Sequence, residues 1–146
     1  NLQELVRNLL KEKQFHKLYE EATRKDGVTG ENLLQFLERR LDNVVFRLGF
    51  SKTRRQARQV VSHGHVTVNG RKVNIASYRV KAGDVISLAE ASRQVGFVKE
   101  AIAEARPASW LELDAAAFTG KVLQNPGRDA VDFELNEALI VEFYSR

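Results

Sequence analysis

The chain of 146 residues is long enough for one well-formed hydrophobic core or for two smaller ones. Its composition, 43% hydrophobic and 29% charged with two prolines, favours a globular fold over a disordered or fibrous one. There is no cysteine, so disulfides and thiolate metal sites are excluded, and no apolar run approaches the roughly 18 residues that predict a membrane span. We therefore expect a soluble protein, with a formal net charge of +4 and no membrane partner.

The N-terminal part predicts amphipathic helices. Apolar residues recur at helical spacing over residues 2–10 and 15–22, and "KDGVTG" is expected to break the run. The chain lacks methionine and starts within the first helical pattern, so we expect a further segment before residue 1. From Glu31 to Leu48 an apolar stripe predicts one helix of about 17 residues, with Gly49 as its C-cap. The other face of that helix carries Arg39, Arg40 and Arg47.

A second helix is predicted to start after Thr53. Gln56 follows Thr53 by three residues, which is the spacing of a capping box. Gly64 is expected to end the helix. The expected inward residues are Ala57, Val60 and Val61, and the expected outward residues are Arg54, Arg55 and Arg58.

Asn69-Gly70, between two alternating runs, predicts a tight hairpin that pairs Val68 with Arg71, Thr67 with Lys72 and Val66 with Val73. One face of the hairpin is expected to join the core, and the other is polar throughout. The expected core residues are Val66, Val68, Val73 and Ile75, and the polar residues are His65, Thr67, Lys72 and Asn74.

The rest of the chain gives weaker signals. Short strands are predicted at "YRV" and "VISL", then a helix over "SRQVGFVKEAIAEA" and a strand at "WLEL". No defined element is predicted through "NPGRD", and the chain ends in an alternating run, "ALIVEFYSR".

Charge is strongly segregated along the chain. Residues 1–38 carry a net charge of −1 and residues 82–146 carry −5, whereas residues 39–81 carry eleven bases and one acid, Asp42, for a net +10. An ordinary solvated surface mixes both signs, so this segment predicts a polyanionic partner. Anionic lipid is the competing interpretation, but it would require a basic amphipathic helix and not glycine-punctuated strands. Nucleic acid is the favoured partner.

Residues 40–88, "RLDNVVFRLGFSKTRRQARQVVSHGHVTVNGRKVNIASYRVKAGDVISL", resemble the RNA-binding module named after small-subunit ribosomal protein four. "KQFHKLYEEA", "GVTGENLLQFLERRLDNVV" and "NEALIVEFYSR" resemble the bacterial or organellar ribosomal-protein-four family itself. The resemblance implies an α+β fold, in which a helical domain is interrupted by a mixed domain with a helix-turn-helix-like pair and a small antiparallel sheet. We expect the helical domain at 1–38, completed by 134–146, the RNA-binding module at 39–102, and the rest of the mixed domain at 103–133.

By the same resemblance, the protein is expected to be a structural constituent of the small ribosomal subunit, in the cytoplasm or an organelle. It would bind the 5′ domain of small-subunit ribosomal RNA at a multi-helix junction, nucleate assembly, and later lie near the messenger RNA entry channel. The implied partners are that RNA, the third and fifth small-subunit ribosomal proteins, and messenger RNA, with no cofactor. A free-standing RNA regulator or chaperone that uses the same module is the alternative.

The candidate RNA-binding residues combine the arginines of the first predicted helix with the positions implied by the resemblance. They are Arg39, Arg40, Arg47, Lys52, Arg54, Arg55, Arg58, His63, His65, Arg71, Lys72, Tyr78 and Arg79. Arginine forks suit phosphates and a tyrosine ring can stack on a base, so shape and backbone contacts are expected to dominate recognition.

Two other kinds of site are weakly indicated. His63 and His65 have no third metal ligand near them in the sequence, which favours a helix-end or phosphate contact over zinc. "RRLDN" resembles the Arg-Leu-Asp motif of pseudouridine synthases that carry the same module, in which the aspartate is catalytic. No catalytic domain of sufficient length follows Asp42, so an ion pair or a surface position is the favoured interpretation and no enzymatic activity is expected.

Overall fold

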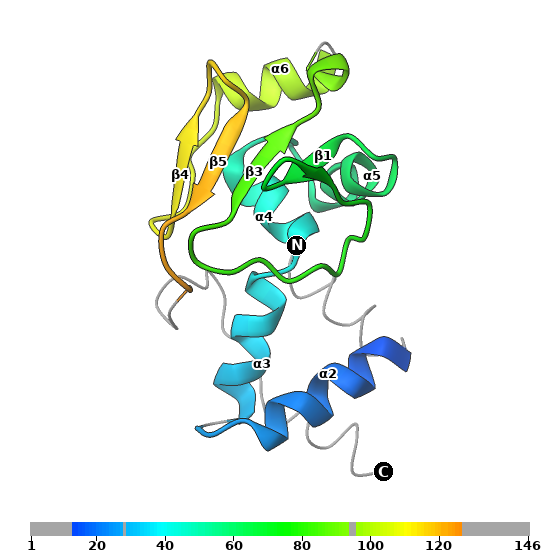
Figure 1. Ribbon diagram of the computed structural model, residues 1–146, viewed down its shortest axis with the longest axis vertical. Coiled ribbons are helices and arrows are strands. Elements are labelled where there is room, and N and C mark those ends of the chain that lie inside the picture. The colour runs from blue at the N-terminus through cyan, green and yellow to red at the C-terminus, as the bar shows by residue number, and fades with distance from the viewer. Residues whose placement is uncertain (1–12, 28, 94–95, 127–146) are drawn as a thin grey trace. The chain divides into compact units, whose positions relative to one another are not determined.

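The computed structural model describes residues 13–27, 29–93 and 96–126 (Figure 1). The described residues divide into two compact units, one up to Leu37 and one from Glu38 to Pro126. The helix predicted over 2–10, the run "ALIVEFYSR" and the completion of the helical domain by 134–146 lie outside the described residues. Within residues 13–27, 29–93 and 96–126, no helix is long and apolar enough to cross a bilayer.

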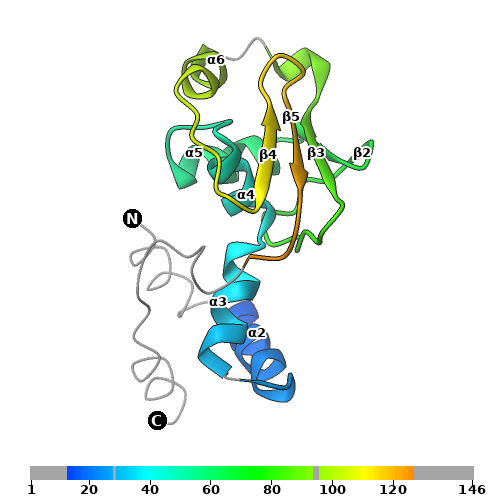
Figure 2. The same ribbon diagram turned by 90° about the vertical axis from the view of Figure 1, so that its left-hand side faces the viewer.

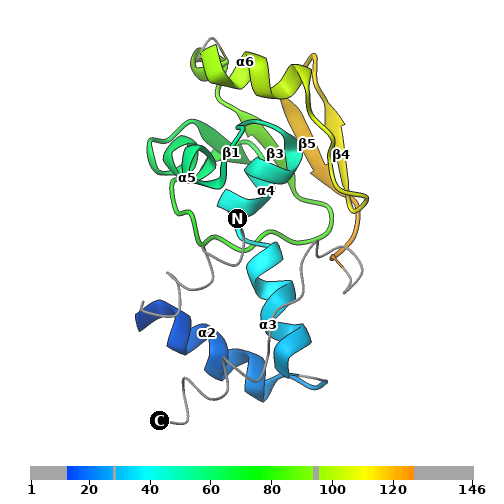
Figure 3. The same ribbon diagram turned by 180° about the vertical axis from the view of Figure 1, so that it is seen from behind.

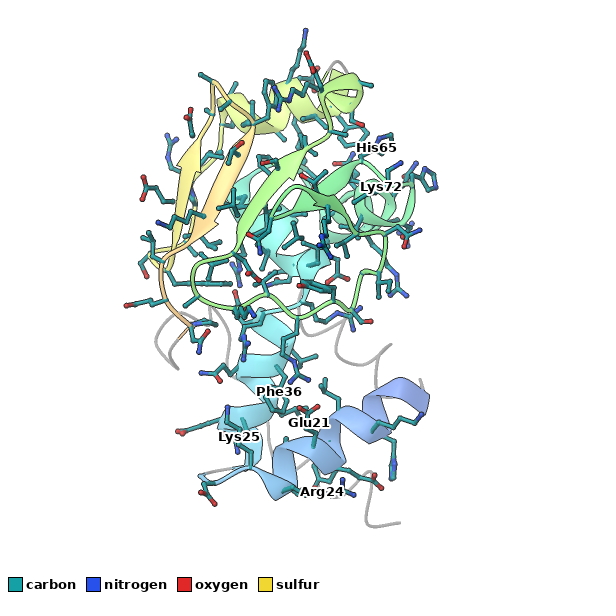
Figure 4. All side chains as sticks on the ribbon, in the orientation of Figure 1. Glu21, Arg24, Lys25, Phe36, His65 and Lys72 are labelled. Atoms are coloured by element: carbon teal, nitrogen blue, oxygen red, sulfur yellow. The ribbon has the colours of Figure 1, made fainter. Side chains whose placement is uncertain are left out.

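The first unit contains α2 (Lys13–Arg24) and most of α3 (Thr29–Glu38), and the predicted break at "KDGVTG" separates them. The Asn32 side-chain amide donates to the carbonyl oxygens of Ala22, Lys25 and Asp26 at 3.1–3.4 Å, which satisfies groups left open at the end of α2. Lys25 Nζ lies 5.3 Å from the centre of the Phe36 ring (Figure 4). These contacts hold the turn between the two helices.

The prediction of one helix from Glu31 to Leu48 is wrong, because the helix is interrupted at Arg39 and Arg40. α3 ends at Glu38, Arg40 is extended (φ −61°, ψ 141°), and α4 (Leu41–Leu48) then begins. The N–H of Val80 donates to Arg39 O at 2.9 Å, and the N–H of Leu41 donates to Tyr78 O at 2.7 Å. Residues 78 and 80 thus make the backbone hydrogen bonds that an uninterrupted helix would have made. The apolar stripe in the sequence gives no sign of these long-range bonds.

The second unit pairs α4 with α5 (Arg54–Ser62), and both helices end as predicted in a glycine with a left-handed conformation. Gly49 has φ 90° and Gly64 has φ 78°. At each end the glycine N–H and the next N–H bond back to the last turn, as in a Schellman motif. The Thr53 hydroxyl accepts from the N–H of Gln56 at 3.0 Å, which confirms the N-cap. The Gln56 side chain reaches the N–H of Lys52 at 3.0 Å instead of that of Thr53.

A five-stranded antiparallel sheet forms the other layer of this unit. Its strands are β1 (Val66–Val68), β2 (Arg71–Lys72), β3 (Val85–Leu88), β4 (Leu111–Asp114) and β5 (Thr119–Val122), in the spatial order β2-β1-β3-β5-β4. After β3 come a short 3-10 helix, η1 (Glu90–Ser92), and α6 (Gly96–Ala103). Figures 2 and 3 show α4, α5 and α6 on one side of the sheet. With its helices, this sheet confirms the α+β class.

The predicted hairpin register is confirmed, since Val68 faces Arg71 and Thr67 faces Lys72. Asn69 and Gly70 both have positive φ (53° and 83°), as the turn requires. The Asn69 side chain also connects the turn to β3: its oxygen accepts from the N–H of Val85 at 2.9 Å and its amide donates to the buried Asp84 carboxylate at 3.0 Å. The turn therefore belongs to the sheet and is not a free loop.

The core between the layers takes in most of the predicted apolar residues of the helices and strands, including Ala57, Val60 and Val61. Ile75, however, is 58% exposed, so its assignment to the core is wrong: β2 ends at Lys72 and the chain leaves the sheet before Ile75. The predicted strand at "YRV" is reduced to an isolated bridge between Arg40 and Arg79. The helix predicted over "SRQVGFVKEAIAEA" is shorter, spanning only Gly96–Ala103.

β5 was not predicted. It runs through "TGKV", whose short alternation is weak, and it closes the sheet between β3 and β4. A methyl group on Gly120 would lie 2.4 Å from Leu48 Cδ2, so only glycine lets β5 pack this closely on α4. The strand is fixed by its neighbours and not by its own composition.

Candidate nucleic-acid interface

The outer face of α5 presents the most exposed part of the basic segment. Arg55 and Arg58 are exposed and three residues apart, so they project from the same face of the helix. Their inward neighbours Ala57, Val60 and Val61 are buried, and the capped first turn fixes where the helix starts. The packing therefore sets the direction of both guanidinium groups. Gln59 also lies on this face, because it is exposed and follows Arg55 by four residues. It was not among the predicted RNA-binding residues, because it carries no charge.

Arg54 lies on the same helix but crosses back over α4. Its Nε donates to Asn43 Oδ1 at 3.3 Å, and its guanidinium carbon lies 4.3 Å from the centre of the Phe46 ring. The side chain is half-buried as a result. Arg54 thus joins the two helices, and its guanidinium plane is held in a fixed orientation at the border of the α5 face.

Arg40 and Arg47, predicted on the outer face of a single helix, are instead turned into the second unit. Arg47 Nε donates to Glu38 Oε1 at 2.8 Å, and the two side chains are 12% and 2% exposed. Arg40 donates through Nε and Nη2 to the two carboxylate oxygens of Asp42, each at 3.2 Å. Both arginines have their charge balanced inside the protein. RNA binding by either stays a prediction, and we leave both out of the proposed surface.

The same geometry bears on Asp42, considered above as a candidate catalytic group. Asp42 is 4% exposed, and besides Arg40 its carboxylate accepts from the N–H of Asn43 at 2.8 Å. A catalytic carboxylate must reach its substrate. The ion-pair interpretation is therefore confirmed: Asp42 lies in the first turn of α4 and pairs with Arg40.

The edge of the sheet adds a second group of cations. Arg71 and Lys72 are exposed on β2, the edge strand. The Lys72 side chain lies against Gly64 at the end of α5, where a methyl group on the glycine would be 3.2 Å from Lys72 Cε and 3.4 Å from Nζ. This contact brings the hairpin and α5 together into one basic surface. Figure 4 shows Lys72 and His65 on the same side of the unit.

The other predicted residues lie at the margins. Lys52 is exposed before α5, with Nζ 3.2 Å from Glu100 Oε2. Tyr78 and Arg79 are half-buried on the segment that pairs with residues 39–41. Arg39 is also half-buried, and its Nε donates to Val80 O at 2.7 Å. These residues are held in place but are less available than those on α5 and β2.

The two histidines differ in environment. His63 is exposed at the end of α5, whereas His65 is half-buried with Nδ1 2.6 Å from Ser92 Oγ. Their ring centres are 6.3 Å apart. Across the described ranges, no group of three His, Cys, Asp or Glu side chains is placed to hold a metal ion.

We name the central set the α5–β2 surface: Arg55, Arg58, His63, Arg71 and Lys72. All five side chains are exposed, and within the described part of the chain none of the four Arg and Lys residues has an acidic group within 4 Å. Exposed, unneutralised cations on a rigid helix and strand edge suit a run of phosphates.

Comparison with known proteins gives two family matches. The S4 domain model matches residues 39–86, and the model of the ribosomal protein S4/S9 N-terminal domain matches residues 3–38. The α5–β2 surface lies entirely within the first match.

Individual relatives agree with these matches. The chain is 68% identical over 135 residues to small ribosomal subunit protein uS4 of Fusobacterium nucleatum, covering 92% of this chain and 69% of that protein. It is 57% identical over 136 residues to uS4 of Thermoanaerobacter pseudethanolicus (92% and 66%) and 54% identical over 142 residues to uS4 of Aquifex aeolicus (94% and 67%). The match thus spans about two thirds of each relative.

Proposed function

Because the chain belongs to the small ribosomal subunit protein uS4 family, we propose that it is a structural constituent of the small ribosomal subunit that binds ribosomal RNA through its S4 domain. The observation that carries this proposal is the α5–β2 surface, where four cations of the +10 segment, Arg55, Arg58, Arg71 and Lys72, are exposed and have no acidic group within 4 Å among the described residues. We assign it no catalytic step, and its place in the cell is the ribosome.

The mechanism is electrostatic binding by a preformed surface. Arg55 and Arg58 contribute planar guanidinium groups that can each hold two phosphate oxygens, and Lys72 adds a compact point charge at the end of the same helix. Binding releases counterions from the RNA, so affinity falls with salt. The major groove of an RNA helix is too deep and narrow for these side chains to contact the bases. The arginines and lysines of the α5–β2 surface therefore recognise the shape and the backbone of a folded RNA.

The finer role follows from the resemblance set out above. The target would be a multi-helix junction in the 5′ domain of small-subunit RNA, and binding it early would nucleate assembly. In the finished subunit the protein would lie near the messenger RNA entry channel, beside the third and fifth small-subunit proteins. Fixing several RNA helices requires a rigid surface, and the paired helices with their capped ends provide one.

A filter-binding titration of the full chain against the isolated 5′-domain RNA, with an unrelated structured RNA as competitor, tests the proposal. We expect selective binding, and a salt slope that falls by about 0.7–0.9 for each of Arg55→Ala and Arg58→Ala if each meets one phosphate. Arg106→Ala, which removes an exposed arginine far along the chain from the S4 domain match, is the matched control. Equal affinity for both RNAs would favour the free-standing RNA-binding alternative, and unchanged slopes in both variants would refute the α5–β2 surface.

A further inference from the structure

A pocket of about 120 Å³ lies in the second unit, next to the α5–β2 surface. It is formed between the C-terminal half of α5, the end of β3, η1 and the start of α6. We propose that it binds one unpaired pyrimidine base of the RNA. This inference rests on the proposed RNA-binding function and deepens it, because it adds a base-recognition site to a surface so far described only as a phosphate-binding one.

The walls of the pocket are half apolar and half polar. Leu88 and Phe97, with one valine each from α5 and α6, supply the apolar part, while Gln59, His63, His65 and Ser92 supply the polar part. A half-buried phenylalanine ring offers a face on which an unstacked base can lie, and stacking on aromatic side chains is the usual way in which proteins hold single-stranded bases. His65 and Ser92 already contact each other at 2.6 Å, so Gln59 and His63 are the polar groups that a ligand can engage.

Size favours a single ring. An apolar protein cavity of about 150 Å³ accommodates benzene, whereas one water molecule needs only about 10–15 Å³. At about 120 Å³ the pocket is smaller than that benzene cavity, so it takes at most one six-membered ring, and the two fused rings of a purine would extend further out of it. The Gln59 amide offers both a donor and an acceptor for the edge of the base, and the preference for a pyrimidine rests on the size of the pocket.

Part of the pocket is already held in place. The 2.6 Å contact between His65 Nδ1 and Ser92 Oγ joins the residue after the α5 turn to η1, and Ser92 is only 6% exposed. His65 is further fixed by its N–H, which donates to Val60 O at 3.1 Å, and by its carbonyl, which accepts from the N–H of Ala89 at 2.8 Å. A rigid wall lowers the entropic cost of ordering a ligand.

The neighbouring charges explain how a base would arrive there. Gln59, on the rim, follows Arg58 directly and follows Arg55 by one helical turn, so the phosphate-binding face and the pocket share α5. A strand or bulge whose phosphates lie along these arginines can turn one base inward past His63. The structure thus combines backbone positioning with a site that distinguishes one class of base.

The test is an NMR titration of the full chain with three probes: uridine 5′-monophosphate, adenosine 5′-monophosphate and ribose 5-phosphate. We expect the uridine probe to shift the Gln59 side-chain amide and the His65 ring signals, and to bind about tenfold more tightly than ribose 5-phosphate, as expected for one stacked base. Gln59→Ala should weaken uridine binding about fivefold, as loss of one hydrogen bond predicts, and leave ribose 5-phosphate unaffected. Ser62→Ala, an exposed change on the same helix that does not line the pocket, is the matched control.

Phe97→Ala should abolish the difference between the uridine probe and ribose 5-phosphate, and Gln59→Ala serves as the surface variant if Phe97→Ala fails to fold. The inference is overturned if uridine and ribose probes bind equally, if the shifts map away from Gln59 and His65, or if adenosine binds more tightly than uridine at these residues. If the chain binds 5′-domain RNA selectively but shows no preference for the uridine probe, base binding by the pocket is ruled out and the proposed function stands. If the chain shows neither selective RNA binding nor a uridine preference, the proposed function is ruled out as well.

Discussion

Two arginines eleven positions apart, Arg47 and Arg58, are expected to respond to mutation in opposite ways. Arg47 is 12% exposed and holds Glu38, itself 2% exposed, at 2.8 Å. Replacing Arg47 by alanine leaves a buried carboxylate without its main partner, and breaking a buried pair in this way costs about 3–5 kcal/mol of unfolding free energy. Arg58 is exposed on the face of α5, so Arg58→Ala should leave stability within about 0.5 kcal/mol.

Urea denaturation of the unmodified chain, Arg47→Ala and Arg58→Ala, monitored by circular dichroism, measures these changes in stability. At an m-value of about 1–3 kcal/mol/M, the Arg47→Ala midpoint should fall by 1 M urea or more. Arg47→Lys should be intermediate, because it keeps the charge but loses the second contact, from Nη2 to Oε2 at 3.5 Å. The double variant Glu38→Leu with Arg47→Leu should recover most of the stability, since neither charge remains buried. A loss below about 1 kcal/mol for Arg47→Ala would refute this account of the pair.

Three further predictions concern the local devices that hold the second unit, and the same urea assay checks each. Thr53→Ala should cost about 1 kcal/mol by freeing the N–H of Gln56, and Thr53→Ser should restore it; equal loss in both variants would contradict the capping role. Asn69→Ala should lower the free energy of unfolding more than Asn69→Gly does. Both variants lose the hydrogen bonds to Val85 and Asp84, but only alanine is strained at φ 53°. A larger loss for Asn69→Gly would contradict this account of the turn. Gly120→Ala should lower the free energy of unfolding by about 1–3 kcal/mol, because the added methyl group clashes with Leu48. Adding Leu48→Val should recover part of that loss. If the losses of the two single variants simply add in the double variant, the contact with Leu48 is not the cause.

The parts of the fold that the sequence predicted are those set by local chemistry. The Thr53 cap, the two helix-ending glycines and the Asn69-Gly70 turn each depend on residues within a few positions of one another, and all four are confirmed. The parts it missed are set by residues far away. The break at Arg40 depends on hydrogen bonds to residues 76–80, and β5 depends on pairing with strands on both sides. Neither leaves a periodic signal in its own segment.

The candidate site shows the same division. Counting charges predicted a basic surface, and helical spacing placed Arg55 and Arg58 on the same outer face. Charge alone could not separate these residues from Arg40 and Arg47, because an arginine that binds phosphate and one that balances a buried acid look the same in sequence. Asp42 was the available signal, because it is a lone acid two positions from Arg40. Glu38 gave no such signal, because it lies nine positions before Arg47 and directly before Arg39. Gln59 and Phe97 gave no signal, since a neutral amide and a phenylalanine are common on any helix.

The backbone bond between Arg39 and Val80 closes a loop that contains almost the whole of the +10 segment. Folding therefore gathers like charges that the unfolded chain can spread apart, and their mutual repulsion opposes closure. Added salt screens that repulsion, and it also screens the attraction to RNA phosphates. Salt should therefore weaken RNA binding and at the same time stabilise the free protein against unfolding. Bound RNA should stabilise the fold in the same way as salt, because its phosphates neutralise the charges of the loop.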